Sequence, residues 1–125
     1  MDARGTVRSK EVEIRVSVQR AMDVCPVEVA IAVLGGAWKM TVVKNLLAGP
    51  LRYGELRRRV GDVTPRVLTR QLRELEQDGI VIRRAYAEVP PRVEYSLTPT
   101  GEGLKGFVTE LNEWGSRYSR SLHRN

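Results

Sequence analysis

Turn-forming glycine and proline residues divide this chain into short segments, and this division is the feature that most limits its fold. They occur at Gly35-Gly36, Gly49-Pro50, Asp78-Gly79, Pro90-Pro91 and Thr98-Pro99. Glycine commonly ends helices and proline opens them, while two successive prolines cannot continue a β-ladder. The spacing predicts the order helix, helix, helix–turn–helix, hairpin, helix, which is an α+β fold that is mostly α.

Apolar spacing and capping residues locate these elements. Thr64 suits an N-cap and Pro65 the first position of a helix. The second helix is expected to place Trp38, Val42 and Leu46 on one side. We expect helices at about 25–34, 37–48, 53–60, 64–78 and 98–121, and strands at about 80–86 and 92–97.

Residues 1–24 form an N-terminal extension whose structure the sequence defines least. Val12, Ile14, Val16 and Val18 alternate with polar residues, which favours a short strand. A helix that runs into Met22 fits the same stretch, so both interpretations stay open. The first ten residues are polar, and we expect them to be mobile. The domain itself is expected over residues 25–125.

Length and composition indicate one small domain with a polyanionic partner. The chain has 125 residues, one cysteine, a formal net charge of +6 and a pI near 10.0. Nothing resembles a secretory signal, and the apolar runs are shorter than the roughly 18 residues of a membrane span. We expect a soluble, cytoplasmic protein with no membrane association. Nucleic acid is the commonest partner for such a charge.

The excess charge lies in the middle of the chain and consists of arginine. Residues 52–92 contain ten arginines, no lysine and six acidic residues. A guanidinium group matches phosphate and guanine edges in a bidentate way that an ammonium group cannot. The type of cation therefore indicates nucleic acid more strongly than the net charge does.

The helix predicted over 64–78 separates its arginines from its leucines. At about 100° per residue, three arginines fall within about 60° of each other and three leucines fall on the opposite side. The arginines are Arg66, Arg70 and Arg73, and the leucines are Leu68, Leu72 and Leu75. One side can pack on the domain while the other enters a DNA major groove about 12 Å wide. The alternative is a solvated face with ion pairs, such as Arg70 with Glu74.

Three longer stretches occur in a recognisable order: "CPVEVAIAVLGGAWKM", "GPLRYGELRRRVGDVTPRVLTRQLRELEQDGIV" and "EVPPRVEYSLTPTGEGL". With them the chain resembles the HxlR family of bacterial winged-helix regulators, relatives of the MarR group, over about residues 25–104. The sequence departs from the family pattern at Ala37, where lysine is usual ("GGKW"), and in its long N-terminal extension.

The resemblance implies a winged helix-turn-helix with a two-stranded wing and a C-terminal dimerisation helix. Such a protein acts as a homodimer on a pseudo-palindromic operator in double-stranded DNA, with the helix at 64–78 in the major groove and the hairpin near the backbone or minor groove. By motif position, the expected DNA-binding residues are Arg52, Tyr53, Pro65, Arg66, Thr69, Arg70, Arg73 and Arg92. Arg52 and Tyr53 would lie near phosphates, and Arg92 in the wing.

The last predicted helix is the expected dimerisation helix. Its candidate interface residues are Leu104, Val108, Leu111, Trp114 and Tyr118. Gly103 and Gly106 each cost about 1 kcal/mol inside a helix, which a close approach of another backbone or simple tolerance would explain. Packing of this helix onto the chain's own first helix is the alternative to dimerisation.

Cys25 is a candidate redox sensor. It begins a helix, where the dipole favours a thiolate, although Glu28 one turn on opposes this effect. The resemblance implies that a cysteine in this position senses oxidants or electrophiles; as the only cysteine, it could form an inter-subunit disulfide or an adduct with a small thiol. The alternative is a small buried residue that serves as an N-cap.

Other classes of function fit less well. His123 is the single histidine, no serine or cysteine has a local base, and no glycine-rich loop resembles a phosphate cradle. We therefore expect no enzyme, no metal site and no cofactor. Two alternatives to a plain DNA-binding regulator stay open. One is a winged helix that binds an acidic protein, and the other is a MarR-type regulator with a small molecule between the core and the dimer helices.

Overall fold

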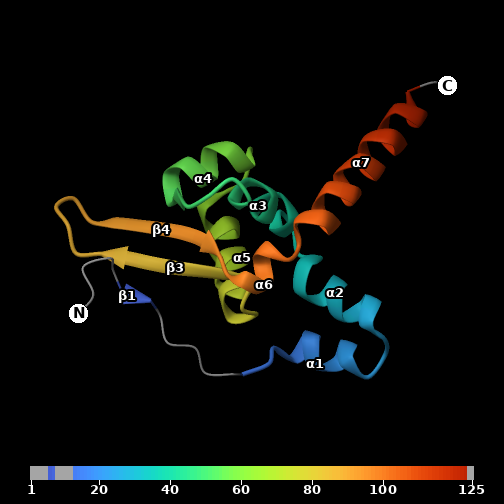
Figure 1. The fold of residues 1–125 in the computed structure, drawn as a ribbon, viewed down its shortest axis with the longest axis horizontal. Helices are drawn as coiled ribbons and strands as arrows, with labels where there is room; N and C mark the ends of the chain where they lie inside the picture. Colours follow the sequence, from blue (N-terminus) through green and yellow to red (C-terminus); the bar gives the residue numbers. More distant parts are fainter. Residues whose placement is uncertain (1–5, 8–12, 124–125) are drawn as a thin grey trace.

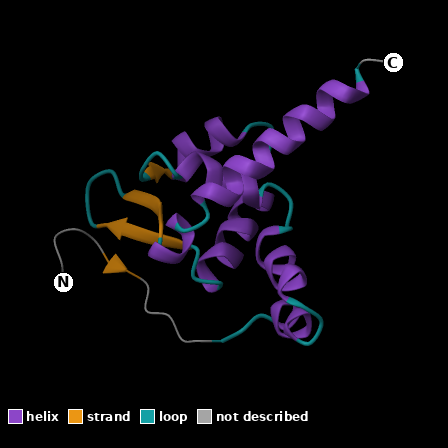
Figure 2. Ribbon diagram, turned by 45° about the vertical axis from the view of Figure 1, so that its right-hand side comes forward, coloured by secondary structure: helices purple, strands orange, loops and turns teal. Residues whose placement is uncertain are grey.

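The helices and strands follow the predicted order. The computed structural model describes residues 6–7 and 13–123. The helices are α1 (Val16–Met22), α2 (Pro26–Leu34), α3 (Lys39–Leu46), α4 (Tyr53–Val60), α5 (Pro65–Gln77), α6 (Pro99–Glu102) and α7 (Lys105–Leu122), and the strands are β1 (Thr6–Val7), β2 (Leu51–Arg52), β3 (Val81–Tyr86) and β4 (Arg92–Leu97). The sheet lies on one side of the helices, and α7 projects away from the body of the molecule (Figures 1 and 2).

The sheet is antiparallel with the strand order β1-β3-β4-β2. Its centre is the β3–β4 hairpin, which pairs Val81 with Leu97 at one end and Tyr86 with Arg92 at the other. The short strand β2 pairs with the middle of β4, the hairpin's second strand, through Leu51 and Tyr95. This pairing ties the segment before α4 to the hairpin, so the two lie on one face of the domain.

The core forms where α3, α4 and α5 meet the sheet. Its least exposed apolar residues are Val42, Val43, Leu46, Leu56, Leu68, Leu72, Leu75 and Val81. Burying a leucine side chain completely contributes about 1.5–3 kcal/mol. Three of these five leucines come from α5, so this helix has one well-defined buried side.

Gly35-Gly36 ends α2, and the chain turns by 80° into α3. A Cβ atom on Gly36 would lie 2.6 Å from Gln71 Oε1, so a larger residue in this turn would displace the Gln71 side chain of α5. The prediction that Trp38 lies on the buried side of the second helix is wrong. Trp38 is the N-cap of α3, with a left-handed backbone (φ 72°) and an exposed side chain. Within the described residues, no single helix is long and apolar enough to cross a membrane. Only α2 and α3, counted together across their bend, have that length and apolar character.

The N-terminal extension differs from the favoured prediction. Val16 and Val18 belong to helix α1 rather than to a strand, and Val12 lies outside the described residues. Helix α1 buries Ala21 and packs on α2, so tertiary contacts override the alternating pattern. A strand does occur earlier, at Thr6–Val7. The other residues among the first ten, which we expect to be mobile, are outside the described part of the chain.

The last predicted helix is divided into α6 and α7. Thr98 caps α6 as predicted, because its Oγ1 accepts a hydrogen bond from the Gly101 backbone N at 3.0 Å. A Cβ atom on Gly101 would collide with the backbone carbonyl oxygen of Ile80, a close approach within the chain that the sequence did not indicate. Gly103 is the C-cap of α6, and a Cβ on Gly106 would meet no described atom within 4 Å.

Candidate nucleic-acid interface

Helix α5 is fixed at both ends by the residues that the sequence predicts. Thr64 has an extended backbone, and its Oγ1 accepts a hydrogen bond from Val67 N at 3.2 Å. Pro65 is the first helical residue, where its missing N–H costs nothing. Gly79, which follows the C-cap Asp78, has a φ of 78° that favours glycine.

The two sides of α5 differ in burial as predicted. Leu68, Leu72 and Leu75 are at most 1% exposed and face the core. Arg66, Arg70 and Arg73 are exposed on the opposite side, and they form what we call the arginine face. Pro65 is also exposed, while Thr69 is half-buried at the border of this face. The core therefore determines which side of α5 meets solvent.

The arginine face is not neutralised by acidic side chains. In the described part of the chain, no carboxylate forms an ion pair with Arg66, Arg70 or Arg73. Glu74, four residues after Arg70, binds Lys39 instead, with 2.6 Å between Oε1 and Nζ. This hydrogen bond from Lys39 is the main reason why the pKa of Glu74 lies below its usual value, and Arg70 contributes only through its more distant charge. The alternative of a self-paired surface helix does not fit this geometry.

Helix α4 holds the start of α5 in place. The Tyr53 hydroxyl donates a hydrogen bond to the Pro65 carbonyl at 3.4 Å, and Arg57 Nε donates one to the Val63 carbonyl at 3.3 Å. Tyr53 therefore lies beside the N-terminus of α5, where its hydroxyl holds the Pro65 backbone. Its contact with phosphate stays a prediction. Arg52 is exposed next to it, and its backbone N binds Glu55 Oε1 at 3.2 Å. The sequence analysis missed the contact of Arg57, because a backbone acceptor leaves no signal in a motif.

Arg92 does not have a free cationic side chain. Its guanidinium group lies 2.7 Å from Glu88 and 3.2 Å from Glu94, and it stacks 3.9 Å above the Tyr86 ring. These three partners sit on the strands and at the tip of the same hairpin. Arg92 therefore joins the two strands of the wing, and these partners compensate its charge in the chain without DNA. Its contact with DNA stays a prediction.

The candidate dimer residues on α7 separate into two groups. Val108 is 5% exposed and belongs to the chain's own core, and Leu104 packs against that core. Leu111, Trp114 and Tyr118 are exposed, and the Trp114 and Tyr118 rings stack at 5.2 Å.

Phe107 and Leu122 extend this exposed stripe along α7. The sequence analysis missed Phe107, although its i, i+4 spacing to Leu111 is the same signal. Apart from its first turns, α7 leaves the body of the molecule (Figure 1). The alternative of packing on the chain's own first helix does not cover this stripe.

Cys25 is exposed and is the N-cap of α2. Its backbone is extended (φ −172°), and its side chain makes no capping hydrogen bond. Since the thiol is not buried, the alternative of a small buried residue does not fit.

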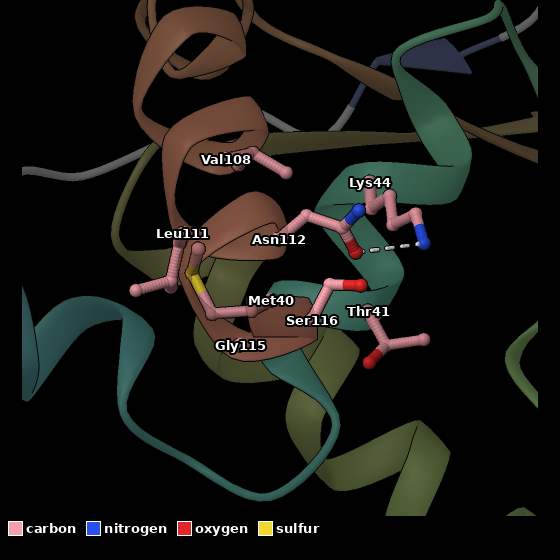
Figure 3. A pocket seen from close by; sticks show the side chains of 8 residues that line it. All are labelled: Met40, Thr41, Lys44, Val108, Leu111, Asn112, Gly115 and Ser116. Carbon is pink, nitrogen blue, oxygen red and sulfur yellow. Dashed lines mark hydrogen bonds between the residues drawn. The ribbon is translucent and has the colours of Figure 1, made fainter. Parts of the chain in front are cut away.

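An open groove of about 460 Å³ separates α3 from α7. Figure 3 shows its lining side chains, which are Met40, Thr41, Lys44, Val108, Leu111, Asn112, Gly115 and Ser116. Lys44 Nζ donates a hydrogen bond to Asn112 Oδ1 at 3.2 Å across the groove. The described residues contain no group of three or more histidine, cysteine or acidic residues suited to hold a metal ion.

Known proteins with similar sequences and structures are regulators. A family model described as HxlR-like helix-turn-helix matches residues 33–123. The HTH-type transcriptional regulator YdeP of Bacillus subtilis (strain 168) is 44% identical over 100 residues, which cover 80% of this chain and 78% of that protein.

Solved structures give the same result. The oxidized form of the redox regulator HypR superposes with a TM-score of 0.70 at 48% identity, covering 74% of this chain and 96% of that one. The crystal structure of the HTH-type transcriptional regulator YtcD has a TM-score of 0.72 at 41% identity, covering 77% and 98%. These relatives are regulators and not enzymes, which confirms that prediction. The chain is a transcriptional regulator with a winged helix-turn-helix fold, and it belongs to the HxlR-like helix-turn-helix family.

Proposed function

We propose that this protein is a homodimeric regulator that binds specific sequences in double-stranded DNA by placing α5 in the major groove. The observation that carries the proposal is the arginine face, three exposed guanidinium groups that form no ion pair with any described residue and lie opposite a buried leucine side. A helix of about 10–12 Å diameter fits a groove about 12 Å wide. Arginine forks can then bind guanine O6 and N7, which gives discrimination among sequences.

Phosphate contacts would supply affinity and register. The N-terminus of α5 presents the positive end of the helix dipole, which favours a phosphate. Arg52 is exposed beside this terminus and is the side chain best placed to add a cation there. Tyr53 contributes by holding the backbone of Pro65. Arg92 is not part of this set.

The exposed stripe of α7 supports the proposed homodimer. Two chains related by a two-fold axis can cover the stripe with the same surface of the partner, which is how most homodimers assemble. The same axis would direct two copies of α5 at two half-sites, so the operator would be pseudo-palindromic.

The test measures DNA selectivity after two arginines are removed from α5. Fluorescence anisotropy compares a duplex from the chain's own upstream region with a scrambled duplex of equal length. We expect the Arg66→Ala/Arg70→Ala variant to lose about 1–3 kcal/mol per arginine at the operator, with much less loss on the scrambled duplex.

The matched control is Arg20→Ala/Arg120→Ala, which removes the same charge from exposed positions on α1 and α7. This control variant should keep the unmodified chain's ratio of operator affinity to scrambled-duplex affinity. Full operator selectivity in the α5 variant would contradict the proposal. Equally weak binding of all duplexes by the unmodified chain would favour the alternative of a module that binds an acidic protein.

Redox control is a second candidate function, favoured by the exposure of Cys25 and by HypR, a structural relative that is a redox regulator. Since Cys25 is the only cysteine, a disulfide formed there must join two subunits or add a small thiol. Operator affinity is measured before and after oxidant treatment. A Cys25→Ser variant that responds to oxidant like the unmodified chain would exclude this role.

The alternative of a small-molecule-responsive regulator has one site to test. A ligand between the core and α7 would occupy the groove beside Met40 and Lys44. Met40→Trp would fill that groove. It should abolish a ligand response and leave operator affinity in the absence of ligand unchanged, whereas a retained response would exclude the groove.

A further inference from the structure

A chain of charged side chains reaches α5 from outside the matched family region. Arg15, the residue before α1, forms a fork with Asp78 at the C-terminus of α5: its Nε is 3.0 Å from Oδ1 and its Nη2 is 2.6 Å from Oδ2. The family match begins at residue 33, so Arg15 lies outside it.

Arg15 also contacts two other elements. Its Nη2 donates to the Ala32 carbonyl of α2 at 2.9 Å, and its Nη1 lies 3.7 Å from Glu74 Oε1. The same Glu74 oxygen binds the buried Lys39 of α3. The side chains of Arg15 and Asp78 are only 14% and 6% exposed, so solvent weakens this fork much less than a surface ion pair.

A second side chain also joins the end of α5 to the segment before α1. Gln77 Nε2 at the end of α5 donates to the Glu13 carbonyl at 3.3 Å. Two independent side chains therefore join the last turn of α5 to the segment before α1. The first turn of α5 is held separately by Thr64, Tyr53 and Arg57. Helix α5 has 13 residues and is about 20 Å long, so contacts at its last turn set its direction together with the packing of Leu72 and Leu75.

We infer that Arg15 is a positioning residue for DNA recognition: by fixing the last turn of α5 to α2, it sets the angle at which Arg70 and Arg73 meet the groove. The inference rests on the proposed function. Arg15 touches no DNA in this scheme and acts only through α5. Losing the fork leaves the number of outward-facing cations on α5 unchanged but lets the second half of the helix tilt. Base contacts depend on that tilt, while phosphate attraction depends mainly on charge.

The experiment compares Arg15→Gln and Arg15→Lys with the unmodified full-length chain. Gln removes the charge and the fork, whereas Lys keeps the charge and cannot form two parallel bonds. Dissociation constants are measured for the operator and for a scrambled duplex, and urea unfolding shows that each variant is folded under the assay conditions. We expect Arg15→Gln to weaken operator binding roughly tenfold and scrambled binding less than about twofold, with Arg15→Lys in between.

A double-mutant cycle with Asp78→Asn separates positioning from general stability. If the fork is the relevant contact, Arg15→Gln/Asp78→Asn loses no more selectivity than Arg15→Gln alone. If Arg15 has only a structural role, its variants are less stable but keep the ratio of operator affinity to scrambled-duplex affinity. That outcome in Arg15→Gln or Arg15→Lys would overturn the inference about Arg15 and leave the proposed function standing. An unmodified chain that binds both duplexes alike would overturn the proposed function and this inference with it.

Discussion

Arg92→Ala is the change that best separates the structural role of Arg92 from a DNA contact. The side chain is 25% exposed, and its guanidinium has two carboxylate partners and a ring partner. A partly exposed ion pair contributes about 0.2–1 kcal/mol, and a cation–π contact about 0.5–1 kcal/mol. Together these contacts predict that the variant loses about 1–3 kcal/mol of unfolding free energy.

Two assays check this value. In urea unfolding, the midpoint should fall by about 1 M with an unchanged slope, since the slope is about 1–3 kcal/mol/M for small proteins. In DNA titrations at several salt concentrations, the dependence of log K on log salt should stay the same, because each lost phosphate contact lowers this slope by about 0.9. Arg58→Ala serves as a control for stability, as Arg58 is exposed on α4 and should change it by less than about 0.5 kcal/mol.

The opposite pattern would refute the reasoning. If Arg92 binds phosphate, a dimer of the variant loses two contacts, and the salt slope falls by about 2. An unchanged urea midpoint together with that fall would mean that the partners of Arg92 within the wing contribute nothing and that the sequence-based assignment was right.

Four further outcomes are expected. Leu72→Ala on the buried side of α5 should cost about 2–5 kcal/mol in urea unfolding, and Leu72→Met less than about 1.5 kcal/mol; equal effects would contradict tight packing there. Because the folded state lowers the pKa of Glu74, its contribution is present above pH about 4.3 and is lost as pH falls through the lower folded pKa, so Glu74→Gln should flatten that acid limb of stability. Burial raises the pKa of Tyr95, so its contribution is present below pH about 10 and is lost as pH rises through the folded pKa; Tyr95→Phe should remove this alkaline loss, and an identical profile would show that another group causes it. Trp114→Glu should shift the proposed dimer to monomer in light scattering while Trp114→Phe does not, and a variant of unchanged mass would exclude the α7 stripe as the interface.

Local signals in the sequence predicted most of the fold. Helix α4 and strand β4 have the bounds expected from their apolar residues and flanking turns. Thr64 and Thr98 cap helices through side-chain hydrogen bonds because threonine before proline is a strong start signal. The exposed side of α5 followed from helical periodicity alone, since burial of its leucines leaves the arginines no other direction.

The sequence did not show several contacts of the folded chain. The alternating valines near the N-terminus favoured a strand, but packing of α1 on α2 makes that stretch helical. The acidic partners of Arg92 are close in sequence, four residues before it and two after it, but the strand pattern does not show that they pair with it. Val108 belongs to the chain's own core, and helical periodicity does not tell a core contact from an interface contact. Arg15 and Asp78 are 63 positions apart, and no local pattern connects them.

The short strand β1 has a consequence for how the protein behaves at high concentration. An uncovered sheet edge offers backbone N–H and C=O groups on which strands of other molecules can add, and this is a common start of aggregation. Beside the hairpin tip, β1 occupies that edge of β3 at Arg84 and Ala85, while β2 occupies the outer edge of β4. The two residues of β1 add little to the folding free energy. At this edge, however, they prevent strands of other molecules from pairing with the part of the wing that extends farthest into solvent.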